Sequence, residues 1–294
     1  MKNKWRVRVL VLMLSLALVL AACGNGGSSE DGDLGKKDIN LSYVEWDSEI
    51  ASTHVMQKVL EDEGYNVEIT PLDNAVMWES VASGETDAMV SAWLPGTHGD
   101  LYKKHKKNLD DLGPNLKGAK IGLVVNKDFD GDSISDLKDQ AGKKIVGIEP
   151  GAGVVKASEK AVKDYNLDGW KVETSSSGAM ATTLGQAMKK GDDIVVTGWS
   201  PHWKFQKYDL KYLKDPKGSF GKAEHINTMA RKDLKKDSPK AYETLDNFKW
   251  TTKDMESVML DIQEGTSPKK AAEKWVDDNQ DKVKEWTKDS KKDK

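Results

Sequence analysis

The chain has 294 residues, more than one hydrophobic core usually supports, so two lobes are expected. Charged residues make up 32% and hydrophobic residues 37%, a balance typical of a globular protein with a well-solvated surface. The formal net charge of −3 argues against a nucleic-acid partner, because binding nucleic acid requires a basic surface.

The N-terminal segment predicts an exported lipoprotein. Four basic residues precede an apolar run over residues 9–20, which is too short for a transmembrane helix of about 20 apolar residues. The run ends in Leu-Ala-Ala-Cys23, the bacterial lipobox pattern. We therefore predict a signal peptide over residues 1–22, a lipid on Cys23 and a flexible tether over residues 23–37. The alternative is an ordinary secretory signal followed by a stray cysteine.

Cysteine and histidine usage argues against metal or thiol chemistry. Cys23 is the only cysteine, so the exported part has no disulfide, no thiol nucleophile and no cysteine-ligated metal site. The five histidines show no metal-ligand spacing. We expect no metal, no cofactor and no catalytic residue.

Beyond the tether, short extended patterns alternate with helical ones. The predicted elements are a strand over 39–45, a helix over 50–61, a strand over 67–70, a helix over 75–82 and a strand over 88–93. This order is typical of a parallel sheet covered by helices.

The same order recurs later in the chain. The predicted elements are strands over 144–148, 171–174 and 193–198, with helices over 154–165 and 178–189 between them. Apolar segments over 120–125 and 225–232 are candidate crossovers between the two regions. Helices are expected over 254–264, after a capping box at Thr251 and Asp254, and from Pro268 to about residue 286.

These patterns predict an α/β protein built as a two-lobed clamp that closes around a ligand. The first lobe is expected to comprise residues 38–124 and 226–290, and the second residues 125–225. The C-terminal helices complete the first lobe in this division. Fold alone does not give function, so the ligand must be inferred from the residues that face the cleft.

Three tryptophans lie at predicted strand ends, where ligands of open α/β sheets bind. Trp46 follows the first strand, Trp93 ends the third, and Trp199 ends the last strand of the second lobe. A quaternary ammonium group has a permanent charge and no N–H donor, but it is attracted to aromatic faces. The three indoles therefore predict a box for such a cation. Any one of them alone could be a core residue, and Trp203 is the main alternative to Trp199.

A subsite for a carboxylate is also predicted. A glycine-rich turn over residues 150–153 joins a strand to a helix, and the free N–H groups at a helix start bind anions. The backbone N–H groups of Gly153 and Val154 are the candidate donors, together with the side chain of His98. Arg231 is the only arginine after the leader and lies outside the expected cleft, so an arginine clamp for an amino acid or peptide is not expected.

At these residues the sequence resembles the glycine betaine-binding proteins of bacterial osmoprotectant ABC importers, most closely their lipoprotein branch. The matching segments are residues 43–51, 91–95 with His98, 147–153 and 197–203. The resemblance implies a type II fold like that of periplasmic binding proteins, with two crossovers between the lobes. It also implies a box of Trp46, Trp93 and Trp199 around the trimethylammonium group. The carboxylate would be held by the backbone of Gly153 and Val154 and by the side chain of His98.

The resemblance further implies a membrane permease as partner and a lipid-anchored, monomeric protein at the outer face of the bacterial cytoplasmic membrane. Proline betaine, carnitine and choline remain alternatives to glycine betaine. A nucleotide-dependent enzyme is a more distant alternative, because Gly147, Gly151 and Gly153 do not have the G-x-G-x-x-G spacing. The other distant alternative is a structural surface lipoprotein.

Overall fold

The computed structural model describes residues 34–288. The predicted signal peptide over residues 1–22, the lipid site Cys23 and most of the tether over residues 23–37 lie outside the described residues.

The first sheet begins with alternating strands and helices, as the sequence predicts. Its elements are β1 (Asp38–Tyr43), α2 (Asp47–Asp62), β2 (Asn66–Pro71), α3 (Asn74–Ser83), β3 (Ala88–Leu94) and β9 (Glu224–Arg231). β1 pairs in parallel with β2 and β3, and β9 pairs antiparallel with β3, so the sheet is mixed. β3 is buried along its whole length, and α2 and α3 both pack against this sheet.

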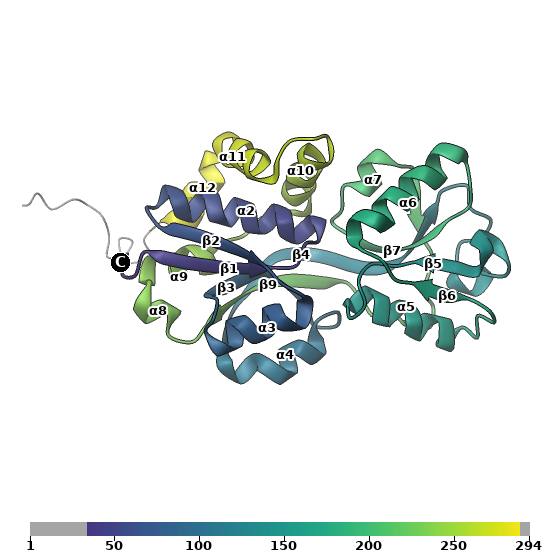
Figure 1. Cartoon of the computed structure of the whole chain (residues 1–294), viewed down its shortest axis with the longest axis horizontal. Coiled ribbons are helices and arrows are strands. Elements are labelled where there is room, and N and C mark those ends of the chain that lie inside the picture. The colour runs from purple at the N-terminus through teal and green to yellow at the C-terminus, as the bar shows by residue number, and fades with distance from the viewer. Residues whose placement is uncertain (1–33, 289–294) are drawn as a thin grey trace, which may run out of the picture. The chain divides into compact units, whose positions relative to one another are not determined.

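The second sheet repeats this plan with shorter strands. Its elements are β5 (Lys144–Val146), α5 (Gly153–Asp164), β6 (Lys171–Glu173), α6 (Ser177–Lys190), β7 (Val195–Ser200), α7 (Lys204–Lys207) and β8 (Leu210–Tyr212). β5 pairs in parallel with β6 and β7, which confirms the expected repetition of strand and helix. Figure 1 shows α5, α6 and α7 grouped around β5, β6 and β7.

One long strand, β4 (Leu109–Asn126), belongs to both sheets. It pairs with β9 up to Ala119 and with β7 from Lys120 onward (Figure 1). The sequence predicts only the second half of β4, because Gly113, Pro114 and Gly118 interrupt any strand pattern in the first half. The register with β9 also shifts in that half. The limits of the two lobes, 38–124 with 226–290 and 125–225, remain a prediction.

The C-terminal third is helical, as expected. Its helices are α8 (Leu234–Asp237), α9 (Pro239–Asn247), α10 (Thr252–Gln263), α11 (Pro268–Asp278) and α12 (Gln280–Thr287), and α10 and α11 pack on α2. The capping box of Thr251 and Asp254 is present. The single helix predicted from Pro268 to about residue 286 is wrong, because the helix breaks at Asn279, which has non-helical backbone angles. The Asn279 side chain donates a hydrogen bond to the carbonyl of Trp275 at 2.8 Å and stabilises the break.

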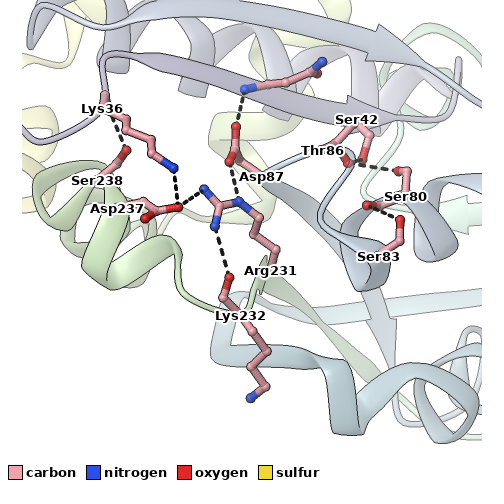
Figure 2. A network of polar contacts seen from close by, with 11 residues as sticks. Lys36, Ser42, Ser80, Ser83, Thr86, Asp87, Arg231, Lys232, Asp237 and Ser238 are labelled. Carbon is pink, nitrogen blue, oxygen red and sulfur yellow. Dashed lines mark hydrogen bonds and ion pairs between the residues drawn. The ribbon is translucent and has the colours of Figure 1, made fainter.

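A network of ion pairs lies at the end of the first sheet where β1 and β3 begin (Figure 2). Arg231, at the end of β9, contacts Asp87 Oδ1 through Nε at 2.7 Å and Asp237 Oδ2 through Nη2 at 2.9 Å. Lys36 Nζ also contacts Asp237 Oδ2 at 2.9 Å, and the backbone N–H of Asn40 donates to Asp87 Oδ2 at 2.7 Å. Arg231 therefore joins β9, α8 and the segment before β3 and has a structural role.

Candidate ligand-binding site

A cavity lies where the carboxyl ends of strands from both sheets meet, and its space amounts to about 340 Å³. That space includes solvent at the mouth of the cavity. All six residues predicted to contact the ligand line it, namely Trp46, Trp93, His98, Gly153, Val154 and Trp199. The cavity brings together residues that are up to about 150 positions apart in the sequence.

The three indoles come from three different elements. Trp46 is the residue immediately before α2, Trp93 is next to the end of β3, and Trp199 lies in β7. All three side chains are buried. Trp46 Nε1 donates to Glu149 Oε2 at 2.8 Å, which fixes the ring of Trp46 against a residue that follows the second sheet's β5. The arrangement provides aromatic surfaces from both sheets around one space.

His98 presents a hydrogen-bond donor that has no partner. Its Nδ1 lies 3.1 Å from the backbone nitrogen of Trp93, which has a hydrogen to donate, so Nδ1 is the acceptor and the proton resides on Nε2. The buried Nε2 has no hydrogen-bond partner among residues 34–288. Burial, and then the charge of Lys156, lower the pKa of His98 to about 3, so the ring is neutral at ordinary pH. His98 thus offers one fixed N–H group at the cavity.

The ring of His98 is held from two sides. It stacks on the indole of Trp46 with a centroid distance of 6.1 Å and an interplanar angle of 28°. Its ring centroid also lies 5.9 Å from that of Trp78, at an interplanar angle of 83°, which is a T-shaped contact. Trp78 is fully buried and is a core residue, as its helical position predicts. The tautomer and the orientation of His98 are therefore both set by neighbouring groups.

The start of α5 supplies further N–H groups. Gly153 and Val154 are the first two residues of α5, and the residue before them, Ala152, has no side chain that could cap the helix. The N–H groups of the first helical turn have no partner within a helix and carry its positive dipole end. A Cβ on Gly153 would lie 2.5 Å from both Cγ2 and the carbonyl oxygen of Thr97. Only glycine therefore permits this close approach between α5 and the segment after β3.

Five further residues, which are not predicted from the sequence, also line the cavity. They are Ser48, Thr97, Ile121, Ile148 and Ala152. Each is within four residues of a predicted site residue or lies on a predicted strand, so position along the chain is the only signal that could have identified them.

Asp47 forms a second set of contacts between α2 and the region around β7. Its carboxylate accepts hydrogen bonds from Ser177 Oγ at 2.9 Å and from Trp203 Nε1 at 2.7 Å, and it lies 3.5 Å from His202 Nε2. Burial raises the pKa of Asp47, but the nearby His202 and the hydrogen bonds from Trp203 and Ser177 outweigh it and hold the pKa well below its usual value. Trp203, the alternative to Trp199, does not line the cavity.

None of the helices in the described part of the chain combines the length and the apolar character that crossing a bilayer demands. No group of three or more His, Cys, Asp or Glu side chains within residues 34–288 is arranged to hold a metal ion.

Two α/β domains that share a long strand and enclose a small aromatic cavity define a ligand-binding protein of the clamp type. The family model for the substrate-binding domain of ABC-type glycine betaine transport systems matches residues 37–278. The chain belongs to this family of transport substrate-binding proteins.

Relatives with known names agree with this assignment. The glycine betaine/carnitine transport binding protein GbuC of Listeria monocytogenes is 52% identical over 158 residues, which are 53% of each chain. The alignment therefore spans about half the length of that curated relative. Lactococcal OpuAC, solved in its closed-liganded conformation with glycine betaine, is 56% identical with a TM-score of 0.84. That match covers 86% of this chain and 100% of the lactococcal chain.

More distant structures share the fold. The glycine betaine/L-proline-binding protein ProX of Borrelia burgdorferi is 34% identical, with a TM-score of 0.82 over 86% of this chain and 97% of that one. A choline-binding protein of an ABC transporter, solved with choline, is 28% identical, with a TM-score of 0.79 over 85% of this chain and 91% of that one. The predicted two-lobed α/β fold class is confirmed.

Proposed function

We propose that this chain is the solute-binding protein of an ABC importer and that it delivers glycine betaine to the membrane permease. The observation that carries the proposal is a single cavity that combines three buried indoles with an unpaired N–H donor on His98. Such a cavity suits a ligand with a quaternary ammonium group at one end and a carboxylate at the other.

The indoles of Trp46, Trp93 and Trp199 form the cation subsite in this proposal. Each contact between a desolvated cation and an aromatic face contributes about 2 kcal/mol, so three contribute about 6 kcal/mol. Micromolar affinity requires about 8 kcal/mol. The remainder must come from the other end of the ligand.

The N–H groups of His98, Gly153 and Val154 form the carboxylate subsite. A hydrogen bond to a charged acceptor contributes about 1.5–3 kcal/mol, so one or two such bonds would supply the difference. A neutral His98 is a suitable donor, because its Nδ1 is occupied and only Nε2–H is available.

The ligand would connect elements of both sheets. Trp46 and Trp93 adjoin the first sheet, while Trp199 and Gly153 belong to the second. Binding energy gained from both sides favours the closed state of a clamp, because only that state allows all the contacts. The bonds of Asp47 and Glu149 across the same junction would add to this preference.

We further propose that the protein is monomeric and is held at the outer face of the cytoplasmic membrane by a lipid on Cys23. The lipobox and the leader support this location. The proposed activity is binding and delivery, with no catalytic step and no cofactor.

The alternative ligand is choline, because a relative that shares the fold is named as a choline-binding protein. Choline has the same cation but lacks the carboxylate. Calorimetric titration with glycine betaine, proline betaine, carnitine and choline separates the possibilities. We expect the zwitterions to bind and choline to bind far more weakly. Equal affinity for choline and glycine betaine would show that the His98 and α5 donors do not hold a carboxylate.

A further inference from the structure

A lysine is completely buried directly beside the proposed cation subsite. Lys204 is the first residue of α7, its side chain is 0% exposed, and its Nζ has no hydrogen-bond partner in the described part of the chain. The Nζ lies 4.2 Å from the centroid of the Trp199 ring. An ammonium group therefore sits over an indole that the proposed function assigns to a different cation.

The ammonium of Lys204 lies against the ring of Trp199, which lines the cavity, but Lys204 itself is not part of the lining. The indole Nε1 of Trp199 also lacks a partner, and His202 makes a T-shaped contact with the ring at 4.7 Å. The ring of Trp199 therefore contacts both the buried ammonium and the ligand space.

Little neutralises the charge of Lys204. Asp47 is the acid that acts on it, but the Asp47 carboxylate is already bonded to Ser177 and Trp203 and lies close to His202. No ion pair within 4.0 Å joins Lys204 to an acid among residues 34–288, and its Nζ instead lies over the rings of Trp199 and Phe205. Burial is the main influence on Lys204 and lowers its pKa to about 7, while Asp47 acts in the opposite direction. The group is therefore charged in mildly acidic solution.

The consequence depends on the net charge of the ligand. Two cations held against one ring repel each other and compete for the same aromatic electrons. The repulsion is weakly screened, because the surroundings are buried. A zwitterion also carries a carboxylate, which the same ammonium attracts, so much of the effect cancels. A ligand with net positive charge has no such compensation.

We propose that Lys204 is a specificity-determining residue that disfavours net cationic ligands such as choline relative to zwitterions such as glycine betaine. The proposal rests on the proposed function, because it requires the quaternary ammonium group to contact Trp199. Lys204 acts through the indole and does not touch the ligand itself.

The test compares Kd values for glycine betaine and choline at pH 6, where Lys204 is charged. Lys204→Met and Lys204→Gln remove the charge with little change in length. We expect choline to bind about tenfold more tightly to both variants and glycine betaine to change by less than about threefold. Lys207→Met is the matched control, because Lys207 lies on the same helix, with its Nζ 5.5 Å from the centroid of Trp203, a ring outside the cavity. We expect no change in the control.

The outcomes are distinguishable. If the wild-type chain binds glycine betaine but the ratio of the two Kd values is the same in a folded Lys204 variant, Lys204 has no role in specificity. A general loss of affinity for both ligands would indicate a structural role and would also contradict the proposal. If the wild-type chain does not bind glycine betaine saturably, the proposed function itself fails. Thermal unfolding identifies any variant that is not folded. If one of Lys204→Met and Lys204→Gln is unfolded, the ratio of Kd values in the other tests the proposal.

Discussion

At the amino ends of β1 and β3, polar side chains are paired with one another, whereas beyond the carboxyl end of β3 a buried donor, His98 Nε2, lies at a cavity without a partner among residues 34–288. The Arg231 network contains two carboxylates that each accept more than one bond (Figure 2). His98, which lines the cavity, has no hydrogen-bond partner for its Nε2 within the described residues. One sheet therefore carries a closed polar network at one end and an open one at the other.

The contrast distinguishes groups that stabilise the fold from groups that are available to bind a ligand. A buried donor without a partner costs about 1–3 kcal/mol, so a fold keeps one only where something offsets that cost. An unpaired donor alone does not identify a site, since the indole nitrogens of Trp78 and Trp250 are also unpaired in the packed core. What distinguishes His98 is that the donor adjoins an open space lined by aromatic rings.

The largest expected effect is a loss of stability when the Arg231 network at the amino ends of β1 and β3 is broken. Arg231→Met leaves the largely buried carboxylate of Asp87 without its ion-pair partner, while Asp237 keeps its ion pair with Lys36. Breaking a buried ion pair by removing one partner is strongly destabilising, and for this partly exposed network we expect a loss of about 3 kcal/mol in the free energy of unfolding. Urea denaturation measures this loss in the free energy of unfolding. The Kd for glycine betaine should stay the same in the folded variant, and a selective loss of binding would contradict the division between the two ends.

The next effect concerns the close approach of α5 to the cavity. Gly153→Ala places a methyl group 2.5 Å from Thr97, so the clamp cannot close fully, and we expect about 30-fold weaker binding of glycine betaine. Gly178→Ala is the matched control, because Gly178 also lies in the first turn of a helix but has no atom within 4 Å of the added group. The control should bind normally. Equal affinity of the two variants in calorimetry would refute the steric argument.

A third effect is the acid sensitivity that His98 introduces. The pKa of His98 is about 3 in the folded protein against an ordinary value of 6.5, so the unfolded chain binds more protons between these values. Stability is therefore complete above pH 6.5 and falls as the pH decreases toward 3. From pH 7 to pH 5 this group should account for a loss of about 2 kcal/mol. Urea denaturation at both pH values should show a smaller loss in His98→Gln, and an identical loss would contradict the prediction.

The smallest effect is on the carboxylate of the ligand. His98→Phe removes the Nε2–H donor, and we expect about tenfold weaker binding of glycine betaine and little change for choline. His105→Phe provides the control, because His105 is also buried, with its Nε2 3.6 Å from Glu79 Oε2, but does not line the cavity. An equal loss of affinity for both ligands in calorimetry would mean that His98 supports the fold of the site and does not bind the carboxylate.

The sequence predicts the alternating strands and helices well, because each is marked by a local hydrophobic period. It predicts the positions of Trp46, Trp93 and Trp199 at the cavity for a similar reason, since strand ends of a parallel sheet meet at one edge. The first half of β4 has no such period, because Gly113, Pro114 and Gly118 interrupt it. The break at Asn279 depends on a side-chain hydrogen bond that no periodicity reports.

Contacts between distant residues are not predictable in this way. The bond from Trp46 to Glu149 joins residues 103 positions apart, and the bond from Trp203 to Asp47 joins residues 156 positions apart. Neither pair has a local signal. The burial of Lys204 contradicts what its charge alone would predict, because lysines are almost never fully buried. These features arise only when the two sheets are brought together.

The central claim is that three indoles hold one quaternary ammonium group. Calorimetric titration of glycine betaine into Trp46→Ala, Trp93→Ala and Trp199→Ala tests it most directly, with Trp250→Ala as the control, because Trp250 is buried outside the cavity. Each box variant loses a face that contributes about 2 kcal/mol, so we expect affinity to fall by about 10- to 100-fold. Trp250→Ala should lose stability and keep its affinity. Unchanged affinity in any two folded box variants would show that the ligand binds elsewhere.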